Sequence, residues 1–231
     1  MLTLELVRIV QDDFSLAVDF TLEQGRILAL IGPSGAGKST LLNVIAGFFP
    51  PQSGRVMWQG RDITGQVPGQ RPIAMLFQDN NLFPHLSALQ NVSLGLRPDL
   101  KLDQAERDQV QDALRRVGLA GLGDRKPGNL SGGQQSRVAL ARILVQRRPL
   151  VLLDEPFAAL GPALKRDMLR LVRDVMADIG GTLIMVSHDP DDARMIADLT
   201  AVVADGTVST PQPTKDLFET PSAALRAYLG D

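Results

Sequence analysis

The chain has 231 residues, 44% of them hydrophobic, and a formal net charge of −2, so it can bury the core of one sizeable domain. It contains no cysteine, which excludes disulfides and thiolate chemistry, and with only two histidines this argues against a structural zinc site. Lysine and arginine form no long basic run, which argues against a nucleic-acid partner. No apolar stretch reaches the roughly 18 residues that span a bilayer. A role at a membrane would therefore require another subunit.

The first elements that the pattern predicts are strands. Residues 2–10 and 14–22 alternate between apolar and polar side chains, as half-buried strands do. Residues 26–31 are almost continuously apolar, which predicts a strand buried on both faces. Two further short strands are predicted at residues 56–58 and 73–77.

A glycine-rich segment follows residue 31 and precedes a helical pattern. It matches G-x-x-x-x-G-K-S, a loop whose backbone N–H groups and following helix N-terminus hold nucleotide phosphates. We expect Lys38 to lie near the β- and γ-phosphates and the Ser39 hydroxyl to join the shell of a Mg²⁺ ion. The loop alone does not separate a transporter ATPase from a kinase or a GTPase. The predicted nucleotide contacts in it are Gly32, Pro33, Ser34, Gly35, Ala36, Gly37, Lys38, Ser39 and Thr40.

The middle of the chain differs in character from its two ends. Residues 79–148 are predicted to be a largely helical lobe, inserted into a nucleotide-binding α/β core of residues 1–78 and 149–231. Within this lobe, Asp103 with Glu106 three residues later forms a capping box that predicts the start of a helix. All 231 residues then form a single domain.

Strands and helices alternate again in the last third of the chain. Apolar strands are predicted at residues 150–153 and 182–187, with a helix at 164–175 between them. Asp205 and Gly206 predict a hairpin turn. This order indicates an α/β fold with a mainly parallel sheet, in which a nucleotide binds at the carboxyl ends of the strands.

Two acidic residues follow the strand predicted at residues 150–153. Asp154 is placed to hold Mg²⁺, directly or through water, and Glu155 can orient or deprotonate an attacking water. Two acids at the start of a loop are common. The functional interpretation gains weight here because they follow a buried-looking strand in a chain that also has a phosphate loop.

The segment Leu130–Gln134 resembles the signature sequence of ABC ATPases. The resemblance implies that two subunits meet head to tail, with the signature of each closing on the nucleotide held by the other. It also implies that Gln78 senses Mg²⁺ and the attacking water, and that His188 contacts the γ-phosphate. The residues predicted to reach the second subunit's nucleotide are Ser131, Gly132, Gly133 and Gln134.

The resemblance runs from Leu2 to about Glu219 and implies the ABC ATPase fold, with a P-loop core, an N-terminal antiparallel β lobe and a helical signature lobe. Two departures stand out. Gly161 occupies a position where the family usually has Asp, which puts the coupling between the two nucleotide sites in doubt. The family commonly stacks adenine on an aromatic residue, but Phe14 and Phe20 are the only aromatics before the P-loop and neither is a clear match.

The segment Phe77–Leu86 resembles the importer branch of the family, in which this surface receives a short helix from the transmembrane permease. His85 is interpreted as part of that surface. With residues 202–206, the segment looks most like the ATP-binding subunits of thiamine importers. Importers of iron, sulfate, polyamines or sugars stay as alternatives, because the solute does not touch this subunit. The predicted apolar contacts are Leu82, Phe83, Pro84 and Leu86.

The sequence therefore predicts an enzyme that hydrolyses ATP with Mg²⁺ and energises transport. It is expected to act as a homodimer on permease subunits at the cytoplasmic face of the inner membrane, indirectly with a solute-binding protein and without nucleic acid. One alternative is an ATPase acting on DNA or ribosomes, although such relatives usually carry coiled-coil insertions, tandem domains or basic surfaces. Another is a nucleotide-binding regulatory module that barely hydrolyses, which Gly161 keeps open.

Overall fold

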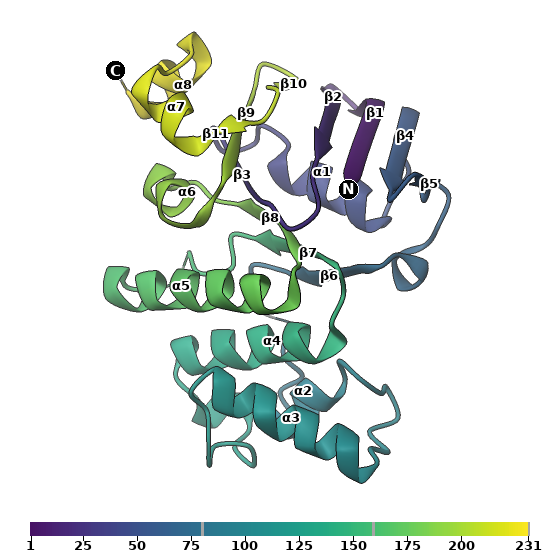
Figure 1. The fold of residues 1–231 in the computed structure, drawn as a ribbon, viewed down its shortest axis with the longest axis vertical. Coiled ribbons are helices and arrows are strands. Elements are labelled where there is room, and N and C mark those ends of the chain that lie inside the picture. The colour runs from purple at the N-terminus through teal and green to yellow at the C-terminus, as the bar shows by residue number, and fades with distance from the viewer. Residues whose placement is uncertain (80, 159, 231) are drawn as a thin grey trace.

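The computed structural model describes residues 1–79, 81–158 and 160–230 (Figure 1). Asn80 of the predicted permease-facing segment and Ala159 of the loop before Gly161 lie outside the described residues. The strands are β1 (Leu2–Gln11), β2 (Phe14–Leu22), β3 (Ile27–Ile31), β4 (Ser53–Trp58), β5 (Arg61–Asp62), β6 (Ile73–Leu76), β7 (Leu150–Asp154), β8 (Thr182–Val186), β9 (Leu199–Ala204), β10 (Thr207–Val208) and β11 (Gln212–Pro213). The helices are α1 (Lys38–Ala46), α2 (Ala88–Ser93), α3 (Gln104–Arg116), α4 (Gly132–Gln146), α5 (Pro162–Ile179), α6 (Pro190–Ile196), α7 (Thr214–Glu219) and α8 (Ala223–Leu229).

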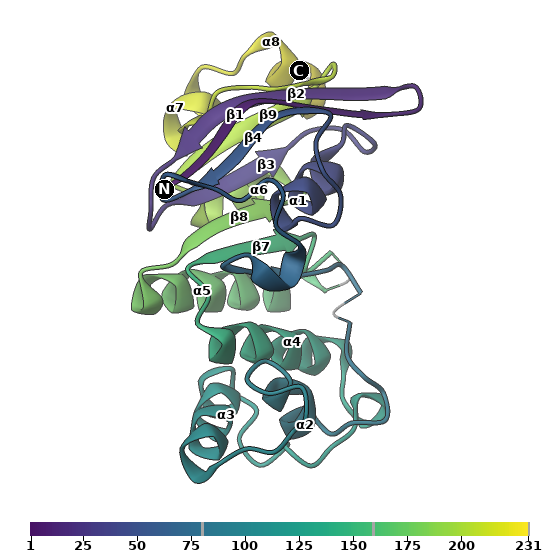
Figure 2. The same cartoon turned by 90° about the vertical axis from the view of Figure 1, so that its right-hand side faces the viewer.

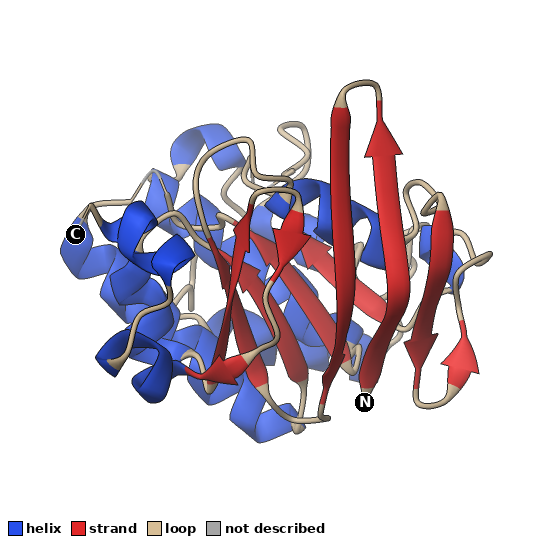
Figure 3. Cartoon of the chain, turned by 90° about the horizontal axis from the view of Figure 1, so that it is seen from above, coloured by secondary structure: helices blue, strands red, loops and turns tan. Residues whose placement is uncertain are grey.

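The strands form one mixed sheet in the order β5-β4-β1-β2-β10-β9-β3-β8-β7-β6, with β11 paired to β9. Strands β9, β3, β8, β7 and β6 run parallel, whereas β5, β4, β1 and β2 form an antiparallel end. Figure 3 shows the strands side by side, with two of them extending well beyond the rest. The predicted α/β class, with a mainly parallel core and an N-terminal antiparallel part, is confirmed.

Every residue of β3 is buried, so this strand is covered on both faces, as the apolar run at residues 26–31 predicts. Leu28 and Leu30 pack with α1 and the antiparallel strands on one face, and Ala29 and Ile31 pack with α6, α7 and α8 on the other. Helix α5 lies between the sheet and α4 (Figure 2). The phosphate loop between β3 and α1 is thus held by a strand and a helix that are both rooted in the core.

The helical lobe contains less helix than its sequence pattern predicts. Between residues 79 and 148 the described α-helices are α2, α3 and α4, and the segments joining them are loops and short turns. Prolines such as Pro84 and Pro98 and positive-φ glycines such as Gly121 explain the difference, because they interrupt helices. The capping box of Asp103 and Glu106 is present at the start of α3, as predicted.

Strand β4 begins at Ser53, three residues before the predicted start. Its second residue, Gly54, has φ +84°, and an added Cβ would lie 2.3 Å from the carbonyl oxygen of Leu6 on β1. The register between the two strands shifts at this place, so glycine is required where their backbones approach. None of the helices that the structure describes is long and apolar enough to cross a membrane.

Candidate functional site

The phosphate loop depends on two glycines that no other residue can replace without strain. At Gly32 φ is +146°, and an added Cβ would lie 2.1 Å from the carbonyl oxygen of Val203 on β9. At Gly37, with φ +97°, an added Cβ would lie 2.2 Å from the ring of Phe14. Gly37 is also the N-cap of α1 and provides no side-chain cap. The first N–H groups of α1 therefore face the loop, where an anion can accept from them.

Lys38 turns back onto the loop that precedes it. Its Nζ donates to the carbonyl oxygens of Gly32 and Pro33, each at 2.8 Å. Burial lowers the pKa of Lys38, while the carboxylates of Glu155 and Asp154 act in the opposite direction. The ammonium is held at the mouth of the loop by two neutral acceptors, which a phosphate group can replace.

Ser39 and Asp154 meet across the end of the sheet. The Ser39 hydroxyl donates to Oδ1 of Asp154 at 2.8 Å. Burial raises the pKa of Asp154 and Glu155 adds to this, whereas the Ser39 hydrogen bond and Lys38 lower it. A hydroxyl and a carboxylate side by side form an oxygen donor set that suits Mg²⁺, which binds through one or two carboxylates together with phosphates and water. Within the described residues, no cluster of three or more acids or histidines is available for a cation.

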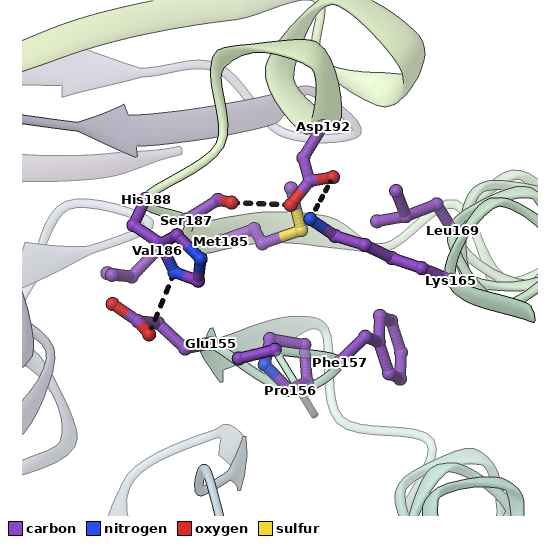
Figure 4. A pocket seen from close by; sticks show the side chains of 11 residues that line it. Glu155, Pro156, Phe157, Lys165, Leu169, Met185, Val186, Ser187, His188 and Asp192 are labelled. Atoms are coloured by element: carbon purple, nitrogen blue, oxygen red, sulfur yellow. Dashed lines mark hydrogen bonds and ion pairs between the residues drawn. The ribbon is translucent and has the colours of Figure 1, made fainter. Parts of the chain in front are cut away.

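Glu155 and His188 face each other across neighbouring strand ends (Figure 4). Nδ1 of His188 lies 3.1 Å from Oε2 of Glu155. The backbone of Glu155 has φ +44°, and its N–H donates to the carbonyl of Val186 on β8. A non-glycine residue in this conformation stores strain that the surrounding fold must support, as often happens at functional sites.

The segment that follows His188 is anchored to α5. Nζ of Lys165 lies 2.8 Å from Oδ2 of Asp189. It also lies 2.8 Å from Oδ1 of Asp192, as Figure 4 shows. The hydrogen bond from Lys165 lowers the pKa of Asp189. The Ser187 hydroxyl donates to Asp192 from the other side. Residues 187–192, here called the switch segment, are therefore tied to the helix that begins after Gly161.

Several of these side chains share a cavity of about 560 Å³, here called the P-loop cavity. It brings the predicted residues Gln78 and Glu155 together with the phosphate loop. It also contains Gln11, which the sequence pattern did not single out, and Phe14, which had no clear match to the aromatic residue on which the family stacks adenine. The only signal for Phe14 is an aromatic residue at a strand end, because its approach to the loop depends on how the β1–β2 hairpin folds over Gly37. The lining residues are Gln11, Phe14, Ser34, Gly35, Gly37, Lys38, Ser39, Thr40, Gln78 and Glu155.

The predicted signature residues do not line the P-loop cavity of their own chain. Ser131 is the N-cap of α4, and its side chain forms a reciprocal capping box with Gln134. Ser131 and Gly132 are exposed, whereas Gly133 is buried and an added Cβ would lie 2.2 Å from the side chain of Leu164 on α5. The structure thus presents a second helix N-terminus at the surface, apart from the first.

The predicted permease-facing segment is shaped by Asn91, which sequence reasoning missed. This fully buried amide accepts from the N–H of Phe83 and donates to the carbonyls of Phe83 and Leu86. The Phe83 ring is 46% exposed and packs edge-on against His85. Phe48 is also exposed and contacts Phe77. Asn91 therefore holds the exposed Phe83 in place, and Phe48 separately packs against Phe77, the residue before Gln78.

Comparisons with known proteins agree with this geometry. A family model described as ABC transporter matches residues 16–158. The thiamine import ATP-binding protein ThiQ of Cereibacter sphaeroides is 57% identical over 230 residues, covering 100% of both chains, and relatives down to 47% identity bear the same name. An ATP-binding cassette of an ABC transporter in its ADP conformation superposes with a TM-score of 0.89 at 27% identity over 100% of this chain and 99% of its own. A dimeric post-hydrolysis cassette bound to ADP and Pi superposes at 0.80 and 29% identity, over 93% and 99%.

Proposed function

This chain belongs to the ABC transporter family, and we propose that it is the ATP-hydrolysing subunit of a thiamine importer. The observation that carries the proposal is the P-loop cavity, in which a phosphate-binding loop, Gln78 and Glu155 converge. The full-length relatives at 47–57% identity, which are named for thiamine import, support the solute. The alternatives of another solute, and of a DNA or ribosome ATPase, gain no support from these relatives.

ATP occupies the P-loop cavity with its phosphates on backbone N–H groups of the phosphate loop and of the first residues of α1. Lys38 exchanges the carbonyl oxygens of Gly32 and Pro33 for β- and γ-phosphate oxygens. Ser39, Asp154 and Gln78 would hold Mg²⁺, which would neutralise charge on the phosphates. Phe14 lies where a base or ribose can pack against its ring.

Hydrolysis depends on the pair formed by Glu155 and His188. Glu155 accepts a proton from, or orients, the water that attacks the γ-phosphate. His188 contacts the γ-phosphate, and its Nδ1 lies 3.1 Å from Oε2 of Glu155, which lines the P-loop cavity. Glu155→Gln should retain nucleotide binding and nearly abolish phosphate release, and unchanged turnover would refute the assigned role.

The signature residues act on a second copy of the chain. Ser131, Gly132, Gly133 and Gln134 lie at the N-terminus of α4, and none of them lines the P-loop cavity of the same chain. One of the structural neighbours was solved as a dimer bound to ADP and Pi. Closure of two copies around two nucleotides moves the helical lobe, and the membrane partner follows that movement.

The permease binds at residues 77–86, the segment that the sequence predicted to face it. Phe83 is exposed there, and Asn91 fixes the loop that carries Phe83 and His85. The subunit is thereby held at the cytoplasmic face of the inner membrane. A solute-binding protein delivers thiamine to the opposite face of the permease.

The test of this function is uptake by cells that lack the gene for this chain. Labelled thiamine uptake should be lost, be restored by the wild-type chain, and not be restored by the Glu155→Gln variant. Uptake of iron, sulfate, polyamine and maltose serves as the control. If thiamine uptake stays normal and uptake of one control solute is lost, that solute would replace thiamine in the assignment. If uptake of every solute stays normal and the purified protein releases no phosphate, the regulatory-module alternative would be favoured.

A further inference from the structure

Tyr228 lies on α8, and its hydroxyl contacts the backbone of the catalytic region. Its hydroxyl donates to the backbone carbonyl oxygen of His188 at 2.5 Å. The backbone of Gly32 lies near enough to the same hydroxyl to influence its pKa. One phenol therefore holds the peptide that carries His188 beside the first glycine of the phosphate loop, and it is the only tyrosine in the chain.

Helix α8 is well seated, so this contact is not that of a fraying end. Leu225 is fully buried in a cluster that includes Ile31, directly before Gly32, and Ala193 of α6. The helix begins at a Ser222 cap and ends at Gly230 in the left-handed conformation. Tyr228 itself packs against the same cluster. The position of its ring is thus set by the core on which the phosphate loop also rests.

The surroundings of the hydroxyl favour its protonated form, which is the form that donates. Burial raises the pKa of Tyr228, and the carboxylates of Asp189, Glu155 and Asp192 raise it further, whereas the backbone of Gly32 lowers it. Lys165, His188 and Lys38 are basic groups that face these acids. The donor is therefore retained throughout the neutral range.

We propose that Tyr228 is a positioning residue, which fixes the His188 peptide and thereby holds the imidazole against Glu155 for hydrolysis. Lys165 already anchors Asp189, the next residue. The Tyr228 hydroxyl supplies the second anchor, on the His188 carbonyl, so that the peptide between the two cannot rotate. This inference rests on the proposed ATPase function, because the hydroxyl acts through His188 and not on the nucleotide.

The decisive experiment is a double-mutant cycle on phosphate release by the full chain assembled with its permease subunits. Tyr228→Phe removes only the hydroxyl and should lower kcat about three- to tenfold, with the KM for ATP changed less than about twofold. In a His188→Ala background the same change should have no further effect. Arg226→Gln is the matched control on α8, because the Arg226 guanidinium bonds to Pro221 within the C-terminal segment. Equal losses from Tyr228→Phe in both backgrounds would show a merely structural role and overturn the proposal.

A second measurement does not depend on hydrolysis. The chain has two histidines, so the imidazole signals of His188 and His85 can be followed together by NMR. Tyr228→Phe should shift the His188 signals and leave those of His85 in place. Unchanged His188 signals would overturn the positioning role of Tyr228, even if the protein releases no phosphate. If the wild-type protein does not hydrolyse ATP, the proposed ATPase function is refuted instead.

The single tyrosine also allows a variant that keeps the shape of the side chain. Biosynthetic replacement of tyrosine by 3-fluorotyrosine lowers the pKa of this one phenol. The alkaline decline of kcat should then move to lower pH, because a phenolate cannot donate to the His188 carbonyl. An unchanged pH profile in the fluorinated protein would contradict the proposal, and this arm is available if Tyr228→Phe fails to fold.

Discussion

Arg71 should be among the most costly side chains to remove outside the catalytic region. Its guanidinium is buried, with the residue 1% exposed, and it donates to carbonyl oxygens of Val44 and Ile45 at the end of α1. It also donates to those of Thr64 and Gln66. A positive charge at this end complements the helix dipole. The helix that presents Lys38 and Ser39 is therefore held at its far end by one buried cation.

The size of the effect follows from the acceptors that lose their donor. In Arg71→Met, the Val44 carbonyl keeps the N–H of Gly47, so three carbonyl oxygens lose a buried hydrogen bond. At about 1 kcal/mol for each, the free energy of unfolding should fall by about 3 kcal/mol. Arg71→Lys keeps the charge but cannot reach both α1 and the loop of Thr64 and Gln66, so it should lose about 2 kcal/mol.

Urea unfolding of the purified chain, followed through its single tryptophan, Trp58, measures these changes. Arg55→Met is the matched control, because Arg55 forms an ion pair with Glu5 in which the two side chains are 62% and 40% exposed. That variant should change the free energy by less than about 0.5 kcal/mol. An Arg71→Met midpoint equal to that of Arg55→Met would refute the reasoning.

Three further predictions follow from the same structure. Phe14→Ala should raise the KM for ATP by about five- to tenfold with kcat nearly unchanged, since the ring contributes about 1 kcal/mol of packing to a base or ribose; an unchanged KM would remove Phe14 from the site. Lys165→Met should cost about 3 kcal/mol near pH 7, because it leaves buried Asp192 without its ion pair. Lys165 lowers the pKa of Asp189, so the stability that comes from this ion pair is present above about pH 4 and is lost as Asp189 is protonated at lower pH. In urea unfolding measured as a function of pH, the difference in free energy of unfolding between wild type and variant should therefore become smaller below about pH 4. Gly161→Asp should raise thermal stability slightly, because residue 161 is the N-cap of α5 and there is open space around an added Cβ. The same change should raise the ATPase rate of the assembled transporter, and a lower rate would show that glycine is preferred at this position.

Local patterns in the sequence predicted the parts of the fold and site that local chemistry determines. The continuous apolar run before Gly32 gave the correct buried strand, and Asp103 with Glu106 gave the correct helix start. In the structure Gln78 and Glu155 lie beside the phosphate loop. The order of the motifs along the chain, which resembles that of ABC ATPases, had indicated this arrangement.

The residues that sequence reasoning missed depend on contacts between distant segments. Arg71 meets α1, Asn91 folds the loop of Phe83, and Tyr228 reaches His188 from forty residues away. Each is an ordinary polar residue in its own segment, and no period or motif marks it. The helical content of residues 79–148 was overestimated for a related reason, since prolines and glycines there end helices whose apolar spacing continues into loops.

The central claim is that one nucleotide is held between the phosphate loop of one copy and the signature residues of another. The chain has no cysteine, so Ser34 and Ser131, both exposed, can be replaced by cysteine in the Glu155→Gln background without competing thiols. With ATP and Mg²⁺, oxidation should give a covalent dimer within minutes, and each single-cysteine variant should give far less. A yield of dimer that is the same with and without ATP, or no dimer at all while ATP is bound, would contradict the account.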